Sequence, residues 1–108
     1  MDVRNLGEVI ASRKLCLVNS GKPRSEIIVK IGKPVELADS PGDFYCPFQV
    51  IGIGSEEIRY AVGGDAVQAL QLVMVMIGAY LSWLNRECGG KLRWDGGKEG
   101  ELGFPVPA

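Results

Sequence analysis

The chain has 108 residues, a formal net charge of −1 and no histidine. This length corresponds to one domain of ordinary size. The balanced charge provides no attraction of the whole molecule to nucleic acid or to anionic lipid. Without histidine, Ser-His-Asp catalysis, Cys-His catalysis and histidine metal ligation are excluded.

The cysteines indicate a reducing compartment. Cys16, Cys46 and Cys88 are scattered and form no C-x-x-C pair, a pattern typical of reduced thiols. The N-terminal residues include Asp2 and Arg4 and lack the apolar run of a secretory signal. We therefore expect a cytoplasmic protein.

Alternation of apolar residues predicts strands in the first two-thirds of the chain. Leu15 and Leu17 share one face of the first strand, and Ile27, Val29 and Ile31 share one face of the second. Turn-forming residues separate the strands. The predicted strands cover residues 14–18, 27–31, 44–53 and 57–62.

The third and fourth of these strands are separated by a short glycine-containing turn, which predicts a β-hairpin. Pro47 lies inside the third strand and has no N–H to donate to a sheet ladder. We therefore expect this strand to lie at an edge of the sheet or to bulge at Pro47.

After Gly63-Gly64 the apolar period changes from that of a strand to that of a helix. Asp65 is a favourable N-cap residue, and Gly89-Gly90 is a typical helix stop. These signals predict a helix over residues 66–87. A short strand over residues 91–94 is expected to follow.

The predicted helix has no charged residue from Ala66 to Asn85, so its length alone would allow it to span a membrane. Its polar residues share one stripe, however, and the strands need a cover for their apolar faces. We therefore favour a core helix on a sheet, with no membrane association. Gly78 and Ser82 form a shallow groove on it, which holds either the protein's own N-terminal segment or tail, or a partner.

Together these elements predict an α+β fold. The antiparallel sheet has four or five strands in the order β-β-β-β-α-β, and one long helix packs on one face. Residues 1–108 form a single domain, in which residues 95–108 provide a loop and an extended C-terminal tail.

No residue cluster indicates catalysis, a metal site or a cofactor. The loop carboxylates do not follow the spacing of an EF-hand. Gly63-Gly64 precedes a helix N-terminus, but Asp65 would repel a phosphate there, so a capping role is favoured. Cys46 is the least improbable nucleophile, although burial is expected for all three thiols.

Four segments of the chain resemble a known family. They are Ile31-Gly32-Lys33-Pro34, Asp43-Phe44-Tyr45-Cys46-Pro47, Gly64-Asp65-Ala66-Val67-Gln68-Ala69-Leu70-Gln71-Leu72 and Leu102-Gly103-Phe104-Pro105. The family consists of small, uncharacterised bacterial proteins and is described as a domain of unknown function. The resemblance extends from about Ile10 to Pro105. It implies a bacterial, soluble, stand-alone domain, and it provides no activity and no catalytic residue.

The leading hypothesis is a non-enzymatic protein-interaction domain, such as an inhibitor, an immunity-type partner or an accessory subunit. Its expected binding residues are Phe44 and Tyr45, beside a Pro-Gly loop, and Gly78 and Ser82 on the helix. The expected partner is another protein or a second copy of the chain.

Two alternatives remain. One is a small-molecule binding module with a pocket between helix and sheet, near Tyr60, Tyr80 and Trp94. The other is an enzyme that uses loop carboxylates such as Asp43, or the thiol of Cys46.

Overall fold

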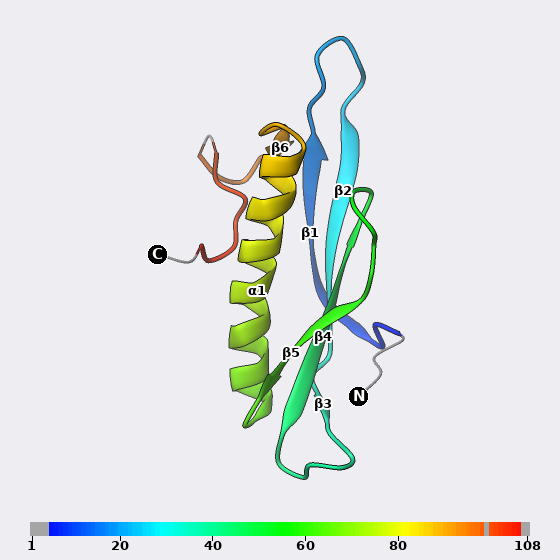
Figure 1. The fold of residues 1–108 in the computed structure, drawn as a ribbon, viewed down its shortest axis with the longest axis vertical. Helices are drawn as coiled ribbons and strands as arrows, with labels where there is room; N and C mark the ends of the chain where they lie inside the picture. The colour runs from blue at the N-terminus through cyan, green and yellow to red at the C-terminus, as the bar shows by residue number, and fades with distance from the viewer. Residues whose placement is uncertain (1–4, 99, 107–108) are drawn as a thin grey trace.

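The computed structural model describes residues 5–98 and 100–106. Its strands all pair in antiparallel fashion in one sheet, and a long helix lies along one face of that sheet (Figure 1). This confirms the predicted α+β class. The elements are β1 (Val9–Leu17), β2 (Ser25–Gly32), β3 (Val35–Glu36), β4 (Phe44–Ile51), β5 (Arg59–Gly63), α1 (Ala66–Glu87) and β6 (Leu92–Arg93).

Strand β4 lies in the middle of the sheet. One of its edges pairs with β5, and the other pairs first with β3 and then with β2. Beyond β2 come β1 and then the short β6. The sheet therefore ends in strand β5 at one edge and in strand β6 at the other.

The expectation of an edge strand at Pro47 is wrong, because β4 is paired on both sides. The ladder with β2 ends where Ile31 faces Phe48, and the ladder with β3 begins at Tyr45. Pro47 lies in the interval between them. A Cβ on Gly32 would lie 2.7 Å from the Pro47 ring, so Gly32 provides the space for that ring. The sheet accommodates the proline by interrupting one ladder.

Strand β1 is longer than predicted. It begins at Val9, with an irregularity in its register between Val9 and Ala11. The side chains of Val9 and Ile10 are both 45% exposed, so this end of the strand has no buried face. Pairing with β2, rather than alternation of apolar residues, holds it in the sheet.

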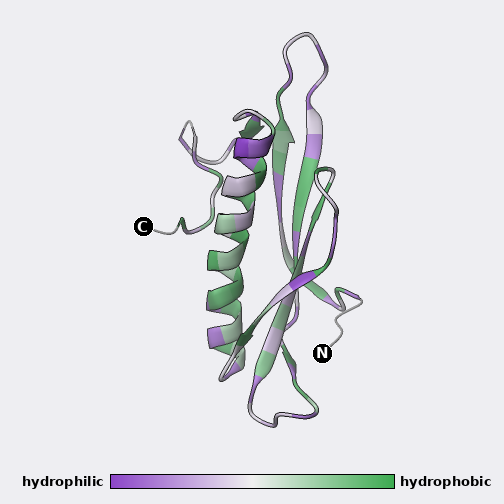
Figure 2. Ribbon diagram, viewed as in Figure 1, coloured by the Kyte–Doolittle hydropathy of each residue, from purple (hydrophilic) through white to green (hydrophobic). Residues whose placement is uncertain are grey.

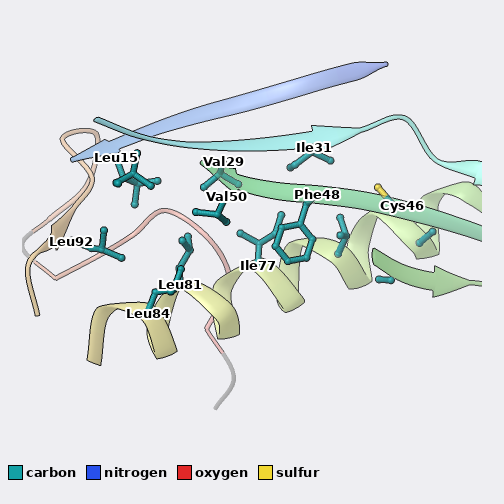
Figure 3. Packing of buried hydrophobic residues seen from close by; sticks show 14 residues of the cluster. Leu15, Val29, Ile31, Cys46, Phe48, Val50, Ile77, Leu81, Leu84 and Leu92 are labelled. Atoms are coloured by element: carbon teal, nitrogen blue, oxygen red, sulfur yellow. The ribbon is translucent and has the colours of Figure 1, made fainter. Parts of the chain in front are cut away.

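The hydrophobic core lies between the sheet and α1. Figure 3 shows side chains of β2 and β4 directed at the helix, with Phe48 next to Ile77. Both are fully buried. The helix has the predicted limits, and the Asp65 carboxylate accepts a hydrogen bond of 2.7 Å from the N–H of Gln68. The capping role of Asp65 is thereby confirmed.

The C-terminal tail returns to α1 and covers Gly78. A Cβ at this position would lie 1.7 Å from the carbonyl oxygen of Pro105, so the close approach requires glycine. Upstream of this contact, the guanidinium of Arg13 lies 4.1 Å from the Trp94 ring and 5.0 Å from the Phe104 ring. Of the two alternatives for the groove at Gly78, the structure shows contact with the protein's own tail.

Helix α1 is also long and apolar enough to cross a membrane, with a mean hydropathy of 1.6 over its most apolar window. One third of that window (33%) is buried within the protein. A helix that covers a sheet meets the same criteria of length and composition, so these two properties do not distinguish between the two environments.

The contact between Gly78 and the tail predicts an unusual result for Gly78→Ala. In an ordinary helix interior this change stabilises by about 1 kcal/mol. Here the new methyl group must displace the backbone of Pro105, so we expect no gain in the free energy of unfolding and faster proteolysis of the tail. Urea denaturation and limited proteolysis measure the two effects. Gln71→Ala, at an exposed site of the same helix that does not line the cavity beneath the tail, is the control. Full stabilisation by Gly78→Ala with an unchanged tail would contradict the prediction.

Candidate functional site

A groove lies at the beginning of β5, between the segment that leads into this strand and the part of α1 that starts at Met76. It consists of two adjoining cavities of about 570 and 580 Å3, and both are lined by Glu57, Arg59 and Tyr80. The first continues past Trp83 to the end of the helix, and the second continues along Met76. We call the two together the β5 groove.

The strand beside this groove has a free edge. Within the part of the chain that the structure describes, β5 pairs with β4 alone. Figure 1 shows β5 beside the first half of α1. An edge strand presents a row of unpaired N–H and C=O groups that can pair with another extended chain. The β5 groove therefore combines backbone hydrogen-bonding groups with a wall of side chains.

The centre of the groove is a stack of one cation and two aromatic rings. The Arg59 guanidinium lies 4.3 Å from the centre of the Tyr80 ring, and the rings of Tyr80 and Trp83 stack at 6.0 Å with an interplanar angle of 17°. Tyr80 also contacts the buried Phe48 edge-to-face at 6.1 Å. The contact with Phe48 connects the stack to the core, so these groups are held in place before any ligand arrives.

Arg59 has few polar partners for its five N–H groups. Its Nη2 lies 3.5 Å from Oε2 of Glu57, whose side chain is 68% exposed. Its Nε is buried and has no hydrogen-bond partner. Exposed ion pairs contribute at most about 1 kcal/mol. The guanidinium therefore retains donor capacity at the centre of the groove.

The outer side of α1 is apolar where it borders the groove. Leu72, Met76 and Trp83 follow one another at helical spacing and are 43%, 38% and 47% exposed. With Val75 they expose on the order of 300 Å2, which is similar to the largest apolar patch of a typical monomeric protein. Figure 2 shows the hydrophobic colouring on the side of α1 turned away from the sheet.

The four predicted binding residues are not brought together. Phe44 packs against the core, whereas Tyr45 contacts Tyr60 edge-to-face at 6.3 Å. Gly78 and Ser82 line a cavity of about 520 Å3 beneath the C-terminal tail. A binding role for these residues stays a prediction, and the structure assigns them to separate places.

The residues proposed for a small-molecule pocket are also divided. Tyr60 and Tyr80 line the β5 groove, but Trp94 lies against Arg13 and is not part of it. Trp83, which was not among the proposed pocket residues, is half-exposed and stacks on Tyr80 in the groove.

The residues considered for catalysis have separate local roles. Asp43 accepts a hydrogen bond from the Ser40 hydroxyl within its loop, and Asp65 caps α1. Cys46 is fully buried, with its Sγ 3.4 Å from the carbonyl oxygen of Gly32. Among the described residues, no group of three or more Cys, Asp or Glu side chains is arranged to hold a metal ion.

Arg59, Met76 and Ala79 line the groove and were not predicted to do so. The available signal was the uncharged, largely apolar stretch of the helix between Ala66 and Asn85, which does not indicate which apolar residues remain exposed. Arg59 carried no such signal, because an arginine in an alternating strand is ordinary.

The fold and the groove define an α+β domain with a free edge strand beside an apolar helix. A family model described as "Domain of unknown function (DUF6968)" matches residues 11–106, and the chain belongs to this family. No curated protein and no solved structure shows a significant match. The resemblance to an uncharacterised single-domain family is thus confirmed, and the bacterial origin stays a prediction.

Burial of Cys46 leads to a pH-dependent prediction. Burial raises the pKa of this thiol from 9.0 to about 11. The folded protein therefore holds the proton more tightly than the unfolded chain, and stability is lost as pH rises through this interval. We expect the free energy of unfolding to fall by on the order of 2 kcal/mol between about pH 9 and 11 through this group.

Urea denaturation of the wild type and of Cys46→Ala over this interval measures the contribution. Other groups also titrate there, so the difference between the two slopes is the quantity of interest. Equal slopes would show that Cys46 does not titrate differently in the two states.

Proposed function

We propose that this protein is a non-enzymatic protein-interaction domain that binds an extended segment of a partner in the β5 groove. The observation that supports this most strongly is the free edge of β5 beside an exposed apolar helix stripe. Addition of a strand to a sheet edge is a recurrent mode of peptide recognition, in which backbone hydrogen bonds provide affinity and side-chain pockets provide specificity.

The geometry suits an added strand. Its backbone would pair with β5, and every second side chain would point toward α1. On that side it would meet Met76, Ala79 and the ring of Tyr80, which line the second cavity. These contacts are largely apolar, so a segment with apolar residues at alternate positions is the expected ligand.

In this proposal the protein acts as an accessory subunit or as an inhibitor or immunity-type partner of another protein in the bacterial cytoplasm. The small size, the net charge of −1 and the lack of histidine are consistent with binding rather than catalysis. The near-neutral charge also favours a protein ligand over nucleic acid or a membrane surface.

A small-molecule binding module is the second candidate. The cavity of about 570 Å3 at Trp83 has the size of a typical ligand pocket. A thermal-shift screen against metabolites addresses this function. A stabilised hit that is lost in Trp83→Ala would favour it over peptide binding.

Selection from a displayed library of random peptides tests the leading proposal. We expect selected peptides to show apolar residues at alternate positions and to perturb the backbone amide signals of β5 in NMR spectra. Ala79→Trp places a bulky neutral side chain in the groove and should weaken binding at least tenfold. Gln71→Trp adds the same side chain on an exposed site of the same helix and should leave binding unchanged.

Two results would contradict this function. One is the failure of the selection to yield any binder to the folded wild type. The other is equal loss of binding in Ala79→Trp and Gln71→Trp, which would show that occupation of the groove is not responsible.

A further inference from the structure

We infer that the segment bound in the β5 groove carries a carboxylate, and that Arg59 binds this carboxylate at the centre of the groove. The inference rests on the proposed function, because it specifies the chemistry of the same ligand. It is carried by the position of Arg59, by its unused donors and by the distribution of acidic residues around it.

Arg59 lies where the two cavities join, since it lines both of them. A strand paired along β5 must therefore pass this side chain. Tyr80 supports the flat face of the guanidinium at 4.3 Å. With the face occupied in this way, the N–H groups at the edge remain for ligand atoms. A guanidinium edge matches the two oxygens of a carboxylate better than any neutral group.

The accessible Nη groups of Arg59 have one charged partner among the described residues, the Glu57 carboxylate at 3.5 Å, whereas the buried Nε is out of reach of a ligand. A ligand carboxylate would form charge-assisted hydrogen bonds with the Nη groups. A neutral peptide offers only carbonyl acceptors, which form weaker bonds, so the two kinds of ligand should differ clearly in affinity.

Glu57 marks the place where the ligand carboxylate would bind, and it competes with that carboxylate for Arg59. Its Oε2 lies 3.5 Å from Nη2 of Arg59, which is longer than a good hydrogen bond. Because both side chains are partly exposed, at 37% for Arg59 and 68% for Glu57, displacement of Glu57 costs little. Removal of the Glu57 charge should therefore strengthen binding of an acidic ligand.

The acidic residues also determine the side from which the ligand carboxylate approaches. Glu87 lines the cavity at Trp83, whereas Glu57 is the one acidic residue that lines the cavity at Met76 and Ala79. Repulsion is thus weaker on the Met76 side. We place the ligand carboxylate there, next to Arg59.

Matched synthetic peptides test this inference. The probes are heptapeptides with valine at alternate positions, an amidated C-terminus and a central Glu, Gln or Lys, together with a Gln peptide that has a free C-terminal carboxylate. We expect the Glu peptide to bind at least tenfold more tightly than either Gln peptide, because a strand that passes Arg59 presents a side chain to it. Tightest binding of the free-acid Gln peptide would assign Arg59 to a chain terminus and contradict a side-chain carboxylate.

Variants of the protein assign the effect to Arg59. Arg59→Gln should remove the preference for the acidic peptide, so that the Glu peptide and the amidated Gln peptide bind this variant with equal affinity. Arg59→Lys keeps the charge but not the planar edge, and should retain part of the preference. Glu57→Gln should raise the affinity for the acidic peptide several-fold. This last variant also serves as the test if Arg59→Gln fails to fold.

Three other outcomes would overturn the inference, and they can be distinguished from one another. Equal binding of all four peptides would leave the groove function standing and exclude a carboxylate requirement. Tightest binding of the Lys peptide would assign recognition to Glu57 and Glu87 instead. Failure of every peptide and of the displayed library would overturn the proposed function and the carboxylate inference together.

Discussion

The packing of α1 on one face of the sheet is the interaction on which the rest of the structure depends. Phe48 at the centre of β4 and Ile77 in the middle of the helix are both fully buried in this contact. A strand with one buried face is stable only if another element covers that face. Loss of the helix would expose the apolar faces of β2 and β4, at about 25 cal/mol for each Å2 of apolar surface.

The same contact creates the groove. The helix follows β5 after a two-residue cap and turns back over the sheet, so it runs beside the free edge of that strand. Tyr80 belongs to both regions, because its ring contacts Phe48 in the core and Arg59 in the groove. A core contact thus holds the ring at the centre of the groove in place. Preorganisation of this kind reduces the entropy lost when a ligand binds.

Local signals in the sequence predicted the elements that are determined by residues close to one another in the chain. The limits of the helix followed from Asp65, from the apolar spacing and from the glycines after Cys88. The position of Pro47 was misjudged because its missing N–H can be accommodated by a gap in the partner strand. The gap lies between β2 and β3, and no local feature of β4 reveals it. The first half of β1 was missed because its apolar residues, Val9, Ile10 and Ala11, are consecutive and exposed, so no apolar alternation marks a strand there.

The sequence by itself determined the fold class, the span of the helix and the surplus of apolar residues on it. These properties depend on residue type and on periodicity, which are readable within one segment. Only the tertiary structure decided that the tail covers Gly78, and that Arg59 meets Tyr80 at a free sheet edge. Such contacts join residues from different elements, and their geometry depends on strand order and on helix placement. No local sequence pattern encodes strand order or helix placement, so the groove could be recognised only in the folded structure.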